Sequence, residues 1–76
     1  MTEVEWINIF GDNLIDMLKE ANMTQKELAD ASGISESMVS DYIHKRRAPR
    51  IRSIINIAYT LDCSVDDLVD FEEMIE

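Results

Sequence analysis

The chain has 76 residues, of which 46% are hydrophobic, with a formal net charge of −9 and one cysteine. This length suits a single small domain over residues 1–76, and one cysteine excludes both an intrachain disulfide and a thiolate metal cluster. With no apolar run near the roughly 18 residues of a membrane span and no signal-peptide pattern, we expect a cytoplasmic protein without membrane association.

The N-terminal part of the chain predicts one long helix. Thr2 and Glu5 have the spacing of a capping box, which satisfies backbone N–H groups at a helix start. Apolar residues follow at helical spacing: Val4, Ile7, Phe10, Leu14, Met17, Leu18 and Ala21. Gly11 lies inside this run, so the helix either continues through it or effectively begins near Phe10.

The middle of the chain carries two helix-start residues eleven positions apart, Thr24 and Ser35. Glu27 completes a capping box with Thr24, and Gly33 can take the left-handed conformation that ends this second helix. Ser35 then opens a third helix, which we expect to run to about His44.

The segment between these two helices has the composition of a helix-turn-helix. Ala29 is small enough to let the two backbones approach each other. The apolar residues of this segment are Leu28, Ile34, Val39 and Tyr42, and of these Leu28, Val39 and Tyr42 fall on the faces that meet beneath the turn. Two short helices crossing steeply through a tight turn form this motif, whose second helix can enter the major groove of DNA.

Two further helices complete the predicted all-α chain. Pro49 blocks continuation of the third helix and fits the first turn of a fourth. The apolar stripe of the fourth helix is Ile51, Ile54, Ile57, Ala58 and Leu61. Ser64 opens a fifth helix, where Asp66 and Asp67 in the first turn favour the helix dipole. The apolar positions of the fifth helix are Val65, Leu68, Val69, Phe71, Met74 and Ile75.

The positive charge is concentrated in one short window. Residues 1–44 hold two bases and nine acids, residues 45–52 hold five bases and no acid, and residues 53–76 hold seven acids and no base. The five bases are Lys45, Arg46, Arg47, Arg50 and Arg52. Such a cluster directly after the third helix can attract DNA phosphates. The anionic remainder favours solubility and predicts weak, salt-sensitive DNA binding.

Three stretches in order resemble the phage-repressor or Cro-like helix-turn-helix family, the XRE class. They are FGDNLIDMLKEANMTQKELADASGIS, the third helix ending YIHKRRAP, and IINIAYTLDCSVDDL. The resemblance covers about Phe10 to Phe71. It implies a five-helix lambda-repressor-like domain with the helix-turn-helix at helices 2 and 3, and double-stranded DNA as the partner.

The resemblance also implies roles for individual residues. It assigns base contacts to the front and exposed face of the third helix, at Glu36, Ser37 and Asp41. Ser40 lies beside them, and we expect it to contact bases too. It assigns phosphate contacts to Gln25, Lys45, Arg46 and Arg47. We expect Arg50 or Arg52, in the same cationic window, to assist. His44, beside the cationic window, is interpreted either as a further phosphate contact or as a solvated helix end.

Four departures from the family pattern carry expectations. Lys45 and Asp62 replace usual glycines; we expect the turn at Lys45 to change shape, whereas Asp tolerates left-handed geometry at residue 62. Leu18 and Ile43 replace an arginine and a glutamate that often pair, which predicts that the two side chains touch.

The fourth departure is the acidity of two base-reading positions. Glu36 and Asp41 could each accept a hydrogen bond from the N4 amino group of cytosine. Either carboxylate could instead repel phosphates and reject wrong sites. Glu36 also stabilises a helix start without any ligand, because it lies in the first turn.

The chain ends carry more apolar residues than the minimal fold requires. These are Trp6, Ile7, Ile9, Phe71, Met74 and Ile75. They either pack on each other and cap the domain's own core, or form a dimer interface. A two-fold dimer would set two third helices about 34 Å apart on a near-palindrome. Cys63 is interpreted as a small buried hydrophobe.

The sequence therefore predicts a sequence-specific DNA-binding transcriptional regulator, a repressor that acts as a homodimer on a near-palindromic operator. The alternative is a protein-interaction module on the same fold, such as an antirepressor or an antitoxin-like partner, favoured by the charge of −9. No acid–base pair, nucleophile dyad, metal cluster or phosphate loop appears, so we expect no enzyme, no cofactor and no small-molecule ligand.

Overall fold

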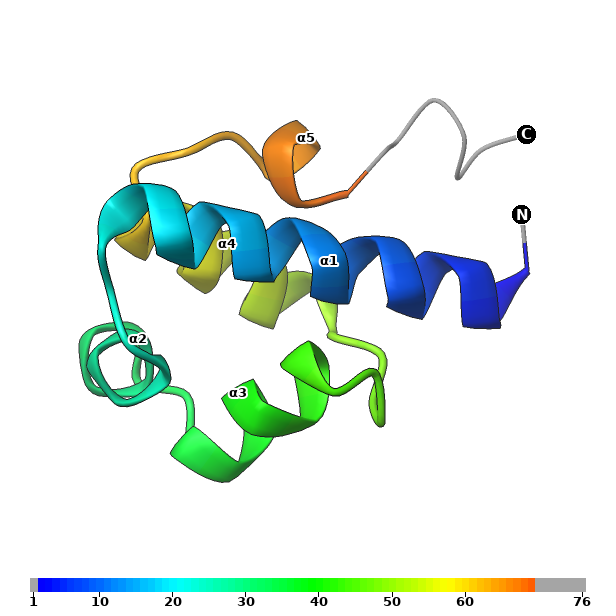
Figure 1. The fold of residues 1–76 in the computed structure, drawn as a ribbon, viewed down its shortest axis with the longest axis horizontal. Coiled ribbons are helices and arrows are strands. Elements are labelled where there is room, and N and C mark those ends of the chain that lie inside the picture. The colour runs from blue at the N-terminus through cyan, green and yellow to red at the C-terminus, as the bar shows by residue number, and fades with distance from the viewer. Residues whose placement is uncertain (1, 70–76) are drawn as a thin grey trace.

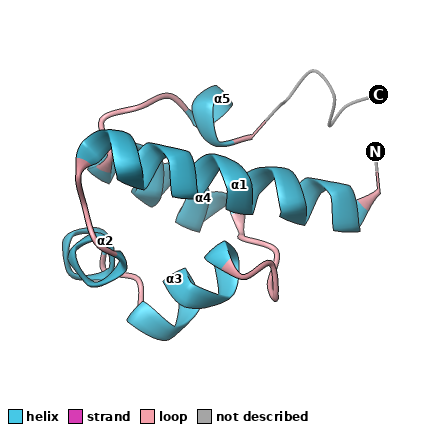
Figure 2. Ribbon diagram, viewed as in Figure 1, coloured by secondary structure: helices cyan, strands magenta, loops and turns pink. Residues whose placement is uncertain are grey.

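The computed structural model describes residues 2–69, which form five helices and no strand, as the sequence predicts (Figure 2). The helices are α1 (Glu3–Ala21), α2 (Gln25–Ser32), α3 (Glu36–Ile43), α4 (Ile51–Thr60) and α5 (Val65–Leu68). In Figure 1, α2 and α3 lie on one side of α1, α5 lies on the other side, and α4 lies behind α1. Within the described residues, no helix combines the length and apolarity needed to cross a bilayer.

The predicted helix boundaries follow from their caps. Thr24 and Glu27 form the complete capping box, with both hydrogen bonds at 3.1 Å. Gly33 ends α2 with a left-handed φ of 76°, and Ser35 caps α3 by accepting from the Met38 N–H at 3.1 Å. These bonds satisfy terminal N–H groups that a helix leaves without a partner, so local chemistry fixes the helix-turn-helix.

The long first helix runs unbroken through Gly11, so the alternative start near Phe10 is wrong. A Cβ added at Gly11 would lie 2.9 Å from the Tyr42 carbonyl oxygen and 3.0 Å from Lys45 Cγ. The absence of a side chain at Gly11 therefore allows α1 to cross close over the end of α3. The packing gained there offsets the poor helix propensity of glycine.

One hydrophobic core joins all five helices of the described part. Its buried members are Phe10, Leu14, Leu18, Leu28, Ala29, Val39, Tyr42, Ile54, Ile57, Ala58, Leu61, Leu68 and Val69. The Tyr42 ring meets the Phe10 ring edge-on at a centroid distance of 5.7 Å, and its hydroxyl donates to Ser53 Oγ at 3.2 Å. This buried tyrosine anchors α3 to both α1 and α4, and its polar end is satisfied.

The apolar residues at the N-terminal end partly cover the domain's own core. Trp6 packs against the core and stacks on Phe10, with ring centroids 6.5 Å apart. Ile7 and Ile9 are half-buried. Their predicted partners near the C-terminus, Phe71, Met74 and Ile75, lie outside the described residues.

The structure corrects three details of the predicted helix faces. Val4 and Ile51 are 67% and 57% exposed rather than buried, because each lies in the first turn of its helix, and Ala21, at the end of α1, is exposed too. Pro49 is buried just before the N-cap residue Arg50 rather than inside the first turn of α4. The fifth helix ends at Leu68, because Val69 is already extended with φ −132° and ψ 148°.

Candidate nucleic-acid interface

The third helix is held by its apolar face, which leaves its polar face outward. Val39 and Tyr42 are buried, whereas Glu36 and Ser37 at the front of the helix are exposed. Ser40 and Asp41, one turn further on, are half-buried. The predicted base-contacting residues therefore share the outer side of α3, with the first two more open to a partner than the last two.

Two arginines fold back onto this helix from the loop that follows it. Arg46 Nε donates to Asp41 Oδ1 at 3.0 Å, and Arg47 Nε lies 3.5 Å from Asp41 Oδ2. A second nitrogen of Arg46, Nη2, donates to Ser40 Oγ at 3.3 Å. We call Ser40, Asp41, Arg46 and Arg47 the arginine cluster; it unites part of the cationic window with α3 on one surface.

The arginine side chains of the arginine cluster remain accessible although they are paired. The Arg46 and Arg47 side chains are 56% and 55% exposed, while the Asp41 side chain is 23% exposed. A phosphate can therefore reach the arginines from the solvent side, but it competes with the carboxylate for their N–H groups.

Lys45 forms the turn after α3 that places Arg46 and Arg47 beside this helix. Its φ is 62°, a left-handed conformation that a glycine at this position would also permit, and the expected difference from the family's turn stays a prediction. Its ammonium Nζ lies 2.7 Å from Asp12 Oδ1 on α1, and its backbone N–H donates to the Tyr42 carbonyl at 3.2 Å. Asp62, with φ 53°, tolerates left-handed geometry as expected.

His44 closes α3 as its C-cap residue. Its Nδ1 donates to the Ser40 carbonyl at 2.8 Å, and Ser40 Oγ lies 3.3 Å from the same nitrogen. The imidazole is exposed, so this contact supports the helix-end interpretation; Nε2 can donate to a phosphate only when both ring nitrogens carry a proton.

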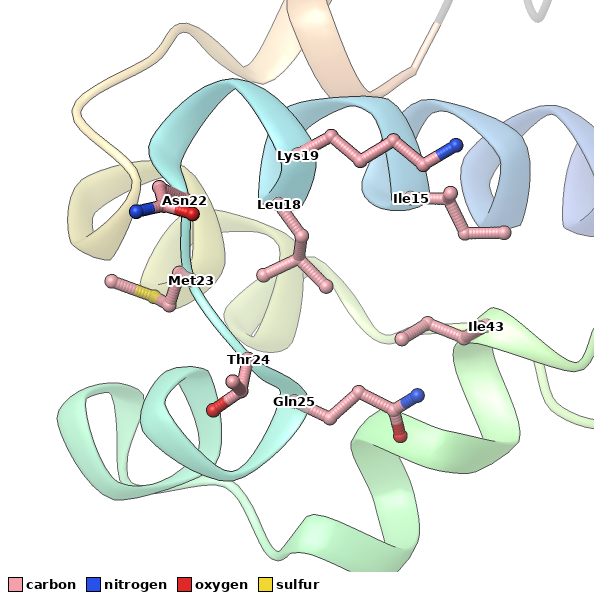
Figure 3. Close-up of a pocket in the computed structure, with 8 residues that line it drawn as sticks. All are labelled: Ile15, Leu18, Lys19, Asn22, Met23, Thr24, Gln25 and Ile43. Carbon is pink, nitrogen blue, oxygen red and sulfur yellow. The ribbon is translucent and has the colours of Figure 1, made fainter.

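Gln25 stands at the start of α2, half-buried beside a hollow between α1, α2 and α3 (Figure 3). The lining residues are Ile15, Leu18, Lys19, Asn22, Met23, Thr24, Gln25 and Ile43. Leu18 and Ile43 both line this hollow, so their side chains do not face opposite sides of the domain. This placement agrees with their alignment to the two residues that often pair in the family.

The two remaining cations of the window lie at the start of α4. Arg50 is its N-cap residue and makes no side-chain cap hydrogen bond, and Arg52 lies in the first turn; both are exposed. Neither belongs to the arginine cluster, so only two of the five cations of the window, Arg46 and Arg47, contact the polar face of α3.

Sequence reasoning missed the pairing of the cationic loop with the carboxylates of Asp12 and Asp41. Asp12 lies 33 positions before Lys45, so their contact depends on the crossing of α1 and α3. Asp41 precedes its arginines by five and six positions, a separation at which a chain leaving a helix can fold back. No group of three or more His, Cys, Asp or Glu residues that could hold a metal occurs in the described part.

Cys63 is half-buried against the core, not fully buried. Desolvation raises the pKa of its thiol, and the nearby carboxylates Asp67, Asp62 and Glu20 raise it further. Both effects disfavour the thiolate, which is the nucleophilic form of the side chain.

Comparison with known proteins identifies the same motif. Residues 14–68 match the helix-turn-helix family HTH_3. The "Uncharacterized HTH-type transcriptional regulator YqaE" of Bacillus subtilis (strain 168) is 34% identical over 64 residues, which is 84% of this chain and 55% of that protein. The "SPbeta prophage-derived uncharacterized HTH-type transcriptional regulator YopS" of the same strain is 33% identical over 58 residues, covering 75% of this chain and 78% of that protein.

A solved structure confirms the fold. The crystal structure of an HTH_3 family transcriptional regulator from Vibrio cholerae superposes with a TM-score of 0.86 at 19% sequence identity. The match covers 97% of this chain and 42% of that one. The chain thus spans about half the length of YqaE and less than half of the Vibrio protein.

Proposed function

The chain belongs to the HTH_3 helix-turn-helix family, and on that premise we propose that it is a sequence-specific DNA-binding transcriptional regulator. It acts as a repressor, binding as a homodimer to a near-palindromic operator in double-stranded DNA. The arginine cluster is the observation that carries this proposal, because it sets two half-exposed arginine side chains beside the polar face of α3. A helix that enters the major groove needs such phosphate anchors at its end.

The proposed base-contact roles of the α3 residues follow the exposure of their side chains. Glu36 and Ser37 lead into the groove, where the serine is small enough for close approach and the glutamate accepts from a cytosine N4 amino group. Ser40 and Asp41 lie further back, where a base contact requires them to share their oxygens with the arginines.

Phosphate contacts surround this face. Their donors are Gln25, His44, Lys45, Arg46, Arg47 and Arg50. Because such contacts position the protein without reading sequence, they provide affinity for any duplex. Occupancy of the operator then blocks polymerase, a mechanism that requires no effector domain.

A titration of labelled duplex at two salt concentrations tests this proposal. At about 50 mM salt the protein should bind any duplex, and at about 200 mM the affinity should fall steeply as counterion release loses its driving force. Selection from random oligonucleotides should then return a near-palindromic site. Negligible binding at about 50 mM salt contradicts the proposal.

The second candidate is a protein-interaction module, an antirepressor or antitoxin-like partner. It is favoured by the internal pairing of Lys45, Arg46 and Arg47 with Asp12 and Asp41, which neutralises much of the loop in a chain of net charge −9. The same titration separates the two candidates, since this module shows no duplex binding even at low salt.

A further inference from the structure

The fourth helix exposes an apolar stripe that faces away from the core. Ile51, Ile55 and Tyr59 are 57%, 51% and 88% exposed, and together with Val4 they are the exposed large hydrophobic residues of the described part. Residues four apart on a helix advance by about 40° per step, so these three side chains lie within about 80° of arc. They form one continuous face about 12 Å long.

This stripe is not needed for the fold of the domain. Ile54, Ile57 and Ala58 on the other side of α4 are 3%, 0% and 4% exposed and already bury that helix against the core. Contiguous exposed apolar patches of a few hundred Å² are often functional, which makes this stripe a candidate contact surface.

Charge complementarity indicates which partner fits. The start of α4 is cationic, with exposed Arg50 and Arg52, whereas the exposed residues after its end are anionic, Asp62, Asp66 and Asp67. Two antiparallel copies of α4 bring the basic end of each against the acidic end of the other. Two parallel copies would instead oppose like charges. A two-fold interface requires such self-complementarity, so a second copy of this chain suits the stripe.

We propose that this stripe is a self-association surface on which a second copy docks with α4 antiparallel to α4 and the two-fold axis near Ile55. The Ile55 side chains then face each other, and Ile51 of each copy faces Tyr59 of the other. This inference rests on the proposed function, because it names the interface of the proposed homodimer. It assigns the interface to α4 rather than to the apolar chain ends around Trp6.

The size of the surface sets the strength of the dimer. Given their exposed fractions, the three side chains offer on the order of 300 Å² per copy, against the roughly 800 Å² per partner of a standard interface. The dimer is therefore weak, with a dissociation constant in the micromolar range or above, and operator DNA completes its assembly.

Sedimentation equilibrium without DNA, from about 10 μM to 1 mM protein, tests the surface independently of DNA binding. The wild-type chain should show concentration-dependent dimerisation. Ile55→Lys sets two ammonium groups against each other at the axis and should weaken dimerisation at least tenfold. Val4→Lys, the same change at another exposed apolar position, should leave it unchanged. Circular dichroism confirms that both variants fold.

A charge exchange tests the antiparallel arrangement. Arg50→Glu and Asp62→Lys should each weaken dimerisation alone, because each variant faces like charges at both ends. Their equimolar mixture should recover it as a heterodimer, because glutamate then faces lysine at one end and arginine faces aspartate at the other.

Three results overturn the proposal: a wild-type chain that stays monomeric to 1 mM, a Val4→Lys variant as impaired as Ile55→Lys, or no recovery in the mixture. The proposed function is judged separately, by titrating a half-site duplex. Ile55→Lys should bind that duplex as the wild type does. A chain that dimerises through α4 yet binds no duplex would refute the DNA-binding proposal alone.

Discussion

Replacing Asp41 by asparagine should tighten binding to DNA of any sequence. In the structure this carboxylate holds Arg46 Nε at 3.0 Å and Arg47 Nε at 3.5 Å. A phosphate must compete with it for both guanidinium groups. The asparagine has nearly the same shape but no charge, so the competition weakens while the helix surface is retained.

The magnitude follows from the exposure of the pairs. Both arginines are more than half exposed, and exposed ion pairs contribute about 0.2–1 kcal/mol each. Two pairs therefore represent roughly 0.4–2 kcal/mol, and at about 1.4 kcal/mol per tenfold this corresponds to a 2- to 25-fold lower Kd. The slope of log K against log salt should steepen by about one, since the arginines release more counterions from DNA.

The assay is fluorescence anisotropy with a random-sequence duplex and with a selected site, at several salt concentrations. Asp16→Asn on the exposed face of α1 is the matched control, because it changes the net charge equally outside the arginine cluster. If Asp41→Asn weakens binding, or affects only sites with a particular base pair, the carboxylate reads bases instead of restraining arginines. If both variants tighten binding equally, the effect is one of net charge.

Three further predictions concern single side chains. Arg46→Ala should weaken binding to all sequences alike and lower the salt slope by about one, whereas Ser37→Ala should alter the preferred base in an oligonucleotide selection; identical behaviour of the two variants contradicts the division of roles. Gly11→Ala should destabilise the fold by about 1–3 kcal/mol in thermal or urea unfolding, because its Cβ would lie 2.9 Å from the Tyr42 carbonyl oxygen; an unchanged or higher Tm contradicts the close crossing. Iodoacetamide should alkylate Cys63 more slowly than an unfolded control near pH 8, because burial raises the pKa of its thiol. As pH rises, the thiol of the unfolded chain loses its proton before that of the folded chain. The contribution of Cys63 to the free energy of unfolding should therefore be full below the unfolded pKa and decline as pH rises through the folded pKa. A rate equal to that of the control argues against this shielding.

Local signals in the sequence are sufficient for the helix-turn-helix. Thr24, Glu27, Gly33 and Ser35 make their hydrogen bonds or turns with neighbours three or four positions away, so the chain itself encodes these boundaries. The core of α4 is likewise predictable from spacing at Ile54 and further along the helix, because burial follows the helical period.

Features that depend on how helices approach each other could not be predicted from spacing. In the sequence, Gly11 indicates a poorly formed helix. The crossing of α1 and α3 in the structure explains why a glycine occupies this position. The pairing of Lys45 with Asp12 depends on the same crossing. Ile51 has a core-like spacing but lies in the first turn of α4, where no neighbouring helix covers it.

The central claim is that α3 and the arginine cluster form the surface that meets DNA. Chemical-shift mapping of backbone amides during titration with a short duplex at low salt tests it most directly. The account predicts the largest shifts at Gln25, along α3 and through residues 44–47, with little change in α5. Shifts confined to α4 and α5, or none at any duplex concentration, would contradict it.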